Sequence, residues 1–299
     1  MFHQKQNRRD FIKLSALTTL SLTWLGKKFN VNNSFLNLFD DDEQICKSRF
    51  GLFIADGLKD KPIGDAIVEI GRSFLGTEYV SNTLEISPET EKLVVNLTEL
   101  DCVTFVENCL TFARCLKKNK TAFEDYKKEL ENIRYRDGII DGYASRLHYF
   151  VDWIYNNETK GVVKDITADI GGVPYKKTIN FMSTHPKSYK QLSDNSNLSG
   201  IIAAEEAINS RDYYYIPKKN ISKVYDWLQN GDIIATTTSI NGLDVTHTGY
   251  VYRGEDGGTY FLHASLKSKK VIISDNLLAD YVSEDSKKTG IIVARPVDV

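Results

Sequence analysis

Five short runs in the last third of the chain read as β-strands, and they limit the fold more than any other feature. The runs are rich in Val, Ile, Thr, Tyr and Phe, and turn residues separate them. They cover residues 231–238, 244–253, 259–266, 269–274 and 290–297. Apolar residues with helical spacing precede them at residues 64–74, 102–116, 143–155 and 196–211. Helices first and strands later predict an α+β domain with an antiparallel sheet.

The segment 98–108, TELDCVTFVEN, predicts the start of a helix. Asp101 is a natural N-cap, because its carboxylate can accept the free N–H groups of the first turn. Cys102 then takes the first helical position, where those groups and the helix dipole favour a thiolate. The preceding residues 91–100 alternate like a short strand. The sequence therefore predicts a strand followed by a helix with a cysteine at its N-terminus.

Composition and charge exclude several classes of protein. Hydrophobic residues make up 41% and charged residues 26% of the 299 residues, which argues against disorder and against several membrane spans. The formal net charge of −2 gives no reason to propose a nucleic acid as a partner. We expect one domain over residues 46–299, and a monomer.

The first residues have the pattern of an export signal. Arg8 and Arg9 precede an apolar run over residues 14–25, which is short for a membrane-spanning helix. The arginine pair resembles a twin-arginine signal, and we expect a protein of the periplasm or cell envelope. No small-residue cleavage site follows, so residues 1–27 could instead stay as an anchor or form an ordinary basic helix. Residues 28–45, rich in Asn and Asp, read as a linker, and no further integral membrane segment is expected.

Among the four cysteines, Cys102 has the sequence context that most favours a nucleophile. Cys109 falls on the apolar face of the predicted helix and is most simply a core residue. Cys46 follows a run of acidic residues, which disfavours a thiolate there. In an exported protein a disulfide is the rival use, and a bond between Cys46 and Cys115 stays open. A buried structural thiol remains the alternative for Cys102.

Two histidines in neighbouring strands offer a base for this cysteine. His247 and His263 flank the turn GEDGG, and pairing Arg253 with Thr259 across it places both imidazoles on one face. They would then be diagonal neighbours, roughly 7–8 Å apart at Cα. This arrangement indicates a Cys–His–His triad. Zinc is the competing use, but no H-E-x-x-H or C-x-x-C spacing is present, and we expect no metal and no cofactor.

Several motifs, taken in order, carry a resemblance to a known superfamily. The chain reads GRSFLGTEYV, DCVTFVEN, GDIIATTT, THTGYVYR and FLHAS between residues 71 and 265. This series resembles the NlpC-type (NlpC/p60) papain-like cysteine peptidases of bacterial cell-wall metabolism. The stretches TELDCVTFVEN, SRLHYFVDWIYNNE, INFMSTHPKSY and NGLDVTHTGY are similar to one branch, the N-acetylmuramoyl-L-alanine amidase-like proteins, formerly a domain of unknown function.

The resemblance implies a papain-like NlpC-type fold, in which the helix with the nucleophile packs on a C-terminal antiparallel sheet. A mixed insertion over about residues 134–215 would separate the cysteine from the first histidine. The implied activity is hydrolysis of the amide between N-acetylmuramic acid and L-alanine in peptidoglycan fragments, through a thioester. Cys102 matches the nucleophile, His247 the general base and His263 the residue that orients it. Tyr79 matches a loop tyrosine that contacts the oxyanion or the substrate.

The insertion contributes weaker candidates for the substrate cleft. Arg146 could bind a stem-peptide carboxylate with both nitrogens, and a structural salt bridge is its alternative role. His148, on the same predicted helix, could reach the cleft or be a satisfied core histidine. Met182, Ser183 and His185 are lesser candidates for lining the cleft.

Other functions stay open beside the amidase. One is an endopeptidase of the same superfamily that cuts between γ-D-Glu and the diamino acid of the stem peptide. Another is a transglutaminase-like acyl transferase, which would require an aspartate such as Asp244 as the third residue. The last is a cell-wall-binding module without catalytic activity.

Overall fold

The predicted strands form the central part of a ten-stranded sheet in the region that the structure describes. That region is residues 40–87 and 89–299 of a computed structural model, so the predicted signal and most of the predicted linker lie outside it. The strands are β6 (Ile233–Thr238), β7 (Val245–Arg253), β8 (Thr259–Ser265), β9 (Lys270–Ile273) and β10 (Lys288–Pro296). They are antiparallel neighbours in the order β9-β8-β7-β6-β10, which confirms all five predictions.

The complete sheet is mixed rather than purely antiparallel. Strand β1 (Glu78–Tyr79) pairs in parallel with β2 (Glu99–Leu100) at one edge and antiparallel with β9. Strands β3 (Val163–Asp165) and β5 (Tyr214–Pro217) both pair with β10, and β4 (Val173–Pro174) pairs with β5. The prediction of a strand over residues 91–100 was wrong except for β2, because most of this segment is irregular.

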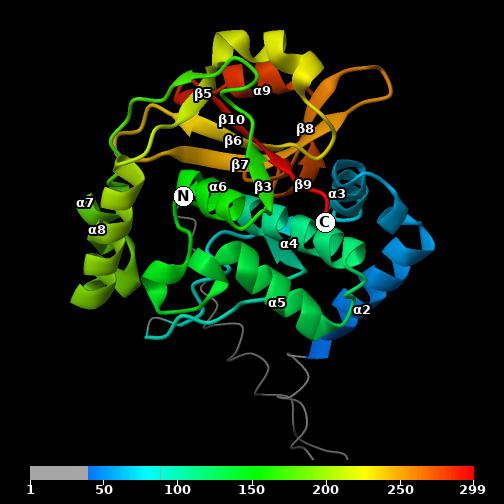
Figure 1. Cartoon of the computed structure of the whole chain (residues 1–299), viewed down its shortest axis with the longest axis horizontal. Coiled ribbons are helices and arrows are strands. Elements are labelled where there is room, and N and C mark those ends of the chain that lie inside the picture. Colours follow the sequence, from blue (N-terminus) through cyan, green and yellow to red (C-terminus); the bar gives the residue numbers. More distant parts are fainter. Residues whose placement is uncertain (1–39, 88) are drawn as a thin grey trace, which may run out of the picture. The chain divides into compact units, whose positions relative to one another are not determined.

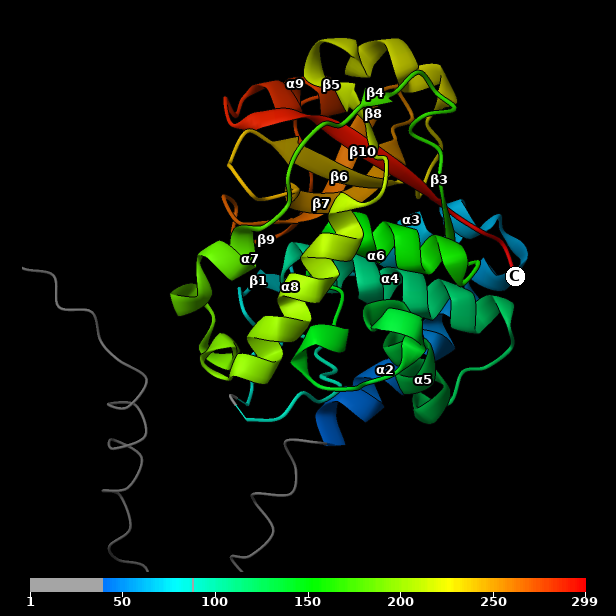
Figure 2. The ribbon, with the colours of Figure 1, turned by 60° about the vertical axis from the view of Figure 1, so that its left-hand side comes forward.

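Both faces of the sheet are covered, so apolar residues stand side by side in parts of the central strands, as in β6 and β10, instead of alternating with polar ones. In β6, Ile233 and Ala235 point into one hydrophobic core and Ile234 into the other. Helices α3 (Ile63–Arg72) and α4 (Cys102–Lys117) cover the first face (Figure 1). Helix α9 (Leu278–Ser283) and the 3-10 segment Lys218–Trp227 cover the second face (Figure 2).

The remaining helices extend the layer below the first face. They are α2 (Asp40–Ala55), α5 (Phe123–Arg134), α6 (Phe150–Thr159), the single turn α7 (Phe181–Thr184) and α8 (Asn195–Asn209). The predicted helices at 64–74, 102–116 and 196–211 are confirmed within one or two residues. The linker prediction was wrong for residues 40–45, which already belong to α2. Phe50 and Phe53 anchor that helix, because both pack edge-on against the ring of Phe112.

The predicted helix over residues 143–155 was wrong in its first half. A 3-10 turn (Tyr143–Ser145) and an extended segment precede α6. The extended segment is held by tertiary contacts: Arg146 forms a β-bridge with Tyr135, and the N–H of Leu147 donates to the carbonyl of Arg134 at 3.0 Å. These long-range bonds outweigh the local helical pattern.

Candidate active site

Cys102 lies at the first position of α4, as predicted, and Asp101 caps the helix. One Asp101 carboxylate oxygen accepts the N–H groups of Val103 at 3.0 Å and Thr104 at 2.8 Å. The Thr104 hydroxyl accepts the Asp101 N–H at 2.9 Å, which completes a capping box. The cap does not use the N–H of Cys102 itself, so this donor stays available next to the thiol.

The protonation state of Cys102 differs from the expectation. Burial, with a smaller contribution from the nearby Asp101 carboxylate, raises the pKa of this thiol to about 12. The backbone N–H groups of Thr248, Cys102 and Val103 act in the opposite direction but are outweighed. The helix start therefore does not produce a resting thiolate, and Cys102 is a neutral thiol at pH 7. All four cysteines are free, so the bond between Cys46 and Cys115 is absent.

His247 on β7 and His263 on β8 form a hydrogen-bonded pair. His247 Nε2 lies 2.7 Å from His263 Nδ1, and the two rings are nearly perpendicular. The predicted register is confirmed, because Arg253 pairs with Thr259. Gly249, opposite His263, leaves room for the His263 side chain, because a Cβ at position 249 would lie only 2.7 Å from the Cβ of His263.

Both imidazoles are neutral at pH 7. Burial, with a smaller contribution from the positive charge of Lys288, lowers the pKa of His263 to about 3. Burial also holds the pKa of His247 well below its usual range, with further contributions from His263 and Lys288. Since Nε2 of His247 faces His263, Nδ1 is the nitrogen left to accept a proton. In that tautomer, His247 Nε2–H donates to His263 Nδ1.

Cys102 and His247 line one cleft with a volume of about 250 Å³. Its wall also includes Asp101, Thr248 and Asp244 from the same end of the sheet and helix layer. Burial raises the pKa of Tyr79 on β1, and its closeness to Cys102 and to the Asp101 carboxylate adds to this rise. The hydroxyl of Tyr79 therefore stays protonated and can donate a hydrogen bond.

Arg146 lines the cleft, but its guanidinium is already bound to two carboxylates. Its Nη2 lies 2.5 Å from Glu85 and its Nε lies 3.4 Å from Glu91. The side chain is only 6% exposed, which fits the structural salt bridge better than a free carboxylate receptor. His148 also lines the cleft, and its Nε2 is bound to the carbonyl of Tyr143 at 2.8 Å. Burial lowers the pKa of His148 to about 3, so it is neutral.

Three other candidates from the insertion do not line this cleft, whose wall is formed by residues that the structure describes. They are Met182, Ser183 and His185. Met182 is buried, and its N–H donates to the hydroxyl of Tyr149 at 2.8 Å. The Ser183 N–H donates to Glu205 at 3.0 Å. His185 is exposed, and its ring stacks on Phe181. The Ser183 bond ties α7 to Glu205 of α8, and the contacts of Met182 and His185 are likewise structural.

Sequence reasoning gave Asp244 a low weight, yet it lies in the cleft and ties two elements together. Its Oδ2 accepts the N–H of Val151 at 2.9 Å, in the first turn of α6. Burial raises the pKa of Asp244 from 3.8 to about 6, and the N–H groups of Val151 and Val245 oppose this rise. The sequence around Asp244 gave no signal for its burial or for its bond to Val151, which is distant in the chain.

Replacement of Asp244 by asparagine should change how stability depends on pH. Because the folded-state pKa is above the unfolded one, the unfolded state loses its proton first, and stability falls as pH rises from about 4 to about 6. The loss is up to about 3 kcal/mol. Asparagine can still accept the Val151 N–H but cannot ionise. Urea unfolding at pH 4 and pH 7 should show a smaller pH effect in Asp244→Asn, and an equal pH effect in both proteins would contradict this.

Two further residues near the pair had no sequence signal. Tyr281 on α9 has its ring centroid 4.9 Å from that of His263. Lys288, at the start of β10, places its Nζ 3.9 Å from the centroid of the Tyr281 ring.

The described residues contain no group of three or more His, Cys, Asp and Glu side chains placed to hold a metal ion. No helix in the described part is long and apolar enough to cross a bilayer.

A thiol at a helix start that shares a cleft with a paired imidazole is the kind of site that nucleophilic hydrolases use. The chain belongs to the N-acetylmuramoyl-L-alanine amidase-like (AmiA-like) family, whose model matches residues 69–291. A comparison with curated proteins finds no match.

Solved structures of similar proteins share the fold of this chain. A crystal structure of an N-acetylmuramoyl-L-alanine amidase from Bacteroides uniformis is 36% identical, with a TM-score of 0.74 over 79% of this chain and 99% of its own. A Bacteroides fragilis protein provisionally described as a xylanase is 39% identical, with a TM-score of 0.71 over 75% of this chain and 98% of its own. A Legionella pneumophila protein shares the fold at 21% identity, with a TM-score of 0.66 over 86% of this chain and 95% of its own.

Proposed function

We propose that this protein is a cysteine amidase that hydrolyses the amide between N-acetylmuramic acid and L-alanine in peptidoglycan fragments. The observation that carries the proposal is the hydrogen-bonded pair of His247 and His263, with His247 lining the same cleft as Cys102. Membership of the amidase-like family supports the substrate class. The order of cysteine helix and histidine strands also favours a papain-like NlpC-type protein.

The first half-reaction follows from the neutral state of the thiol and the imidazole. As Cys102 Sγ attacks the carbonyl carbon, its proton moves to Nδ1 of His247. The N–H of Cys102 and the hydroxyl of Tyr79 stabilise the oxyanion of the tetrahedral intermediate. The C–N bond then breaks, the imidazolium gives its proton to the leaving amine of L-alanine, and a thioester remains.

The second half-reaction restores the enzyme. His247 takes a proton from water, and the resulting hydroxide attacks the thioester carbonyl. The C–S bond breaks, the acid is released, and the proton returns from His247 to the sulfur of Cys102. Throughout both halves, His263 holds His247 in the required tautomer by accepting its Nε2–H at 2.7 Å.

Product analysis separates this proposal from its rivals. Purified protein is incubated with N-acetylmuramoyl-L-Ala-γ-D-Glu-diaminopimelate, and the products are identified by mass spectrometry. The amidase releases N-acetylmuramic acid and the intact tripeptide. Release of N-acetylmuramoyl-L-Ala-D-Glu would support the endopeptidase instead, and an intact substrate bound to the protein would support a binding module.

Replacement of His263 by alanine should lower kcat/KM on the order of 10²-fold, because His247 loses its orienting partner. His263→Asn should retain more activity, since its amide oxygen can accept the Nε2–H. Asp244→Asn is the matched control in the same cleft and should stay near the wild-type rate. An inactive Asp244→Asn beside a fully active His263→Ala would favour the transglutaminase-like alternative.

We also propose export to the periplasm or cell envelope, where such fragments occur. The support is the arginine pair and apolar run within residues 1–27, which lie outside the described residues.

A further inference from the structure

A buried cation lies behind the histidine pair, on a strand that the proposed mechanism does not use. Lys288 opens β10 and is only 8% exposed. The register between β10 and β6 shifts between Lys288 and Gly290, and such irregularities redirect side chains. Burying an ammonium is costly, so its position calls for a physical reason.

The geometry connects this ammonium to the histidine pair through one aromatic ring. Lys288 Nζ lies 3.9 Å from the centroid of the Tyr281 ring, within the range of a cation–π contact. The Tyr281 ring lies 4.9 Å from the ring of His263 and 6.4 Å from that of His247. Phe261 stacks on His263 at 4.7 Å and lies 5.1 Å from Tyr281. The His263 ring is therefore part of one aromatic cluster with Phe261 and Tyr281, and it is fully buried.

Lys288 approaches the pair from outside the proposed substrate cleft. A second groove of about 650 Å³ shares Thr246 and His247 with that cleft and includes Tyr281 and Lys288 in its wall, whereas Cys102 is in the wall of the first cleft only. A substrate carbonyl on Cys102 would thus lie in the cleft, and the ammonium would act on His247 from the other groove. Lys288 is not placed to touch the reacting atoms.

We infer that Lys288 is a positioning residue of the active site: its positive charge, acting across Tyr281, adds to burial in disfavouring a proton on the histidine pair. The inference rests on the proposed roles of Cys102 and His247. The same charge makes the transient His247 imidazolium a stronger acid towards the leaving amine. Without Lys288, the pair would bind its proton at a somewhat higher pH, and the His247 imidazolium would be a weaker acid.

Other charged and titratable groups lie around the pair in both grooves. Cys102 and Asp101, at the start of α4, share the wall of the cleft with His247, as does Asp244, and Tyr79 lies beside Cys102 on β1. Glu284 and Asp285 follow α9 and raise the pKa of Lys288, although its burial lowers that pKa by more. Lys267 lies 3.9 Å from Glu284 at the exposed rim. The strand neighbours in register are uncharged, namely Thr236 opposite His247 and Ile272 opposite His263.

Histidine titration by ¹⁵N NMR tests the inference without any substrate. We compare the wild type with Lys288→Met, which keeps an unbranched side chain but removes the charge, and with Lys288→Arg, which keeps the charge. The pair titrates as a unit, so its macroscopic pKa is the readout. Lys288→Met should raise this pKa by about 0.5–1, whereas Lys288→Arg should stay near the wild type. The acid limb of kcat/KM should move up by the same amount.

A double variant on the exposed rim guards against misfolding of Lys288→Met. Glu284→Gln with Asp285→Asn removes two anions that oppose the ammonium, so the pKa of the pair should fall. An unchanged pKa in Lys288→Met, an equal rise in Lys288→Arg, or a rise in the rim variant would overturn the inference. A protein that shows the expected titrations but releases no product would instead contradict the proposed function.

Discussion

Replacement of Cys102 by alanine should lower the rate of muramoyl-L-alanine hydrolysis by about 10⁴-fold or more. The nucleophile has no substitute, because the other three cysteines are at most 1% exposed and lie in the core. Removing the nucleophile of a triad typically costs this much, and only binding and oxyanion stabilisation then contribute. Product release from a defined muropeptide, followed by mass spectrometry, measures the rate.

Cys109→Ala is the matched control on the same helix. Its thiol is fully buried two turns further along α4, so the substitution removes a core contact and not the proposed nucleophile. We expect a loss of stability of about 1–2 kcal/mol with kcat nearly unchanged. If Cys102→Ala and Cys109→Ala lowered the rate to the same extent, Cys102 would be a structural thiol.

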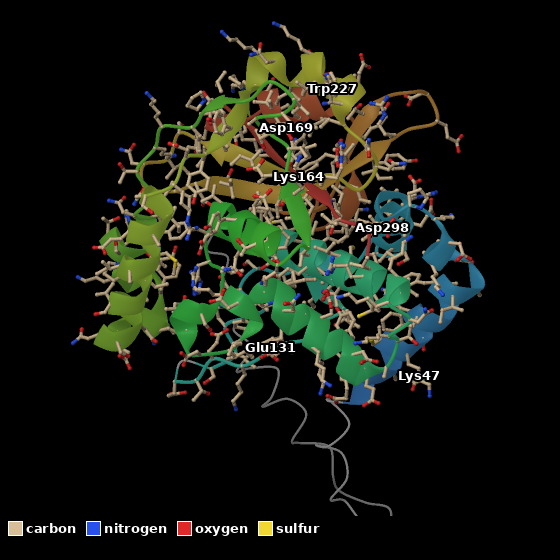
Figure 3. All side chains as sticks on the ribbon, viewed as in Figure 1. Lys47, Glu131, Lys164, Asp169, Trp227 and Asp298 are labelled. Carbon is tan, nitrogen blue, oxygen red and sulfur yellow. The ribbon has the colours of Figure 1, made fainter. Side chains whose placement is uncertain are left out.

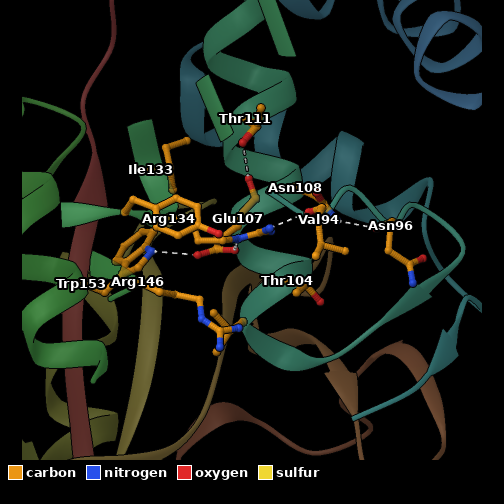
Figure 4. A network of polar contacts seen from close by, with 12 residues as sticks. Val94, Asn96, Thr104, Glu107, Asn108, Thr111, Ile133, Arg134, Arg146 and Trp153 are labelled. Carbon is orange, nitrogen blue, oxygen red and sulfur yellow. Dashed lines mark hydrogen bonds and ion pairs between the residues drawn. The ribbon is translucent and has the colours of Figure 1, made fainter. Parts of the chain in front are cut away.

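Replacement of Arg134 by methionine should destabilise the fold by about 3–5 kcal/mol, because it leaves a carboxylate buried without its partner. Arg134 Nε lies 2.7 Å from Glu107, and both side chains are 2% exposed (Figure 4). The Trp153 indole N–H also donates to Glu107, and the Arg134 guanidinium donates to the carbonyl of Val94. This network joins α4, α5 and α6 below the nucleophile. The free energy of unfolding in urea measures the effect.

Lys164→Ala is the control for this prediction. Lys164 and Asp169 also form an ion pair, at 2.9 Å, but both side chains are 61% exposed (Figure 3). Such a pair should contribute less than about 1 kcal/mol. A cost below about 1 kcal/mol for Arg134→Met as well would mean that Glu107 takes up a proton or finds water when its partner is lost.

The hairpin of β7 and β8, which carries His247 and His263, could be predicted from the sequence because a short turn fixes its register. The GEDGG turn sets the pairing of Arg253 with Thr259, and the alternation of a strand then places His247 and His263 on one face. The start of α4 at Cys102 could be predicted for a similar reason, since Asp101 and Thr104 form its capping box within one turn. These elements depend on contacts only a few residues apart or across one turn.

The parts that could not be predicted depend on distant partners. Arg146 sits in an extended segment because Tyr135, Glu85 and Glu91 bind it, and its local sequence favours a helix. Lys288 reaches the histidine pair only once β10 has paired with β6. The pKa of Cys102 is raised where the sequence predicted a lowered one, because burial outweighs the effect of the N–H groups at the helix start. The depth of burial cannot be read from the residues around Cys102.

The most direct test of the proposed function is the mass of the acyl group on the enzyme. The protein is mixed with N-acetylmuramoyl-L-Ala-γ-D-Glu-diaminopimelate, quenched in acid within milliseconds, digested and analysed by mass spectrometry. We predict an N-acetylmuramoyl thioester on the peptide that contains Cys102, absent from Cys102→Ala. An adduct that still contained L-Ala and D-Glu, or an adduct on any other residue, would contradict the account.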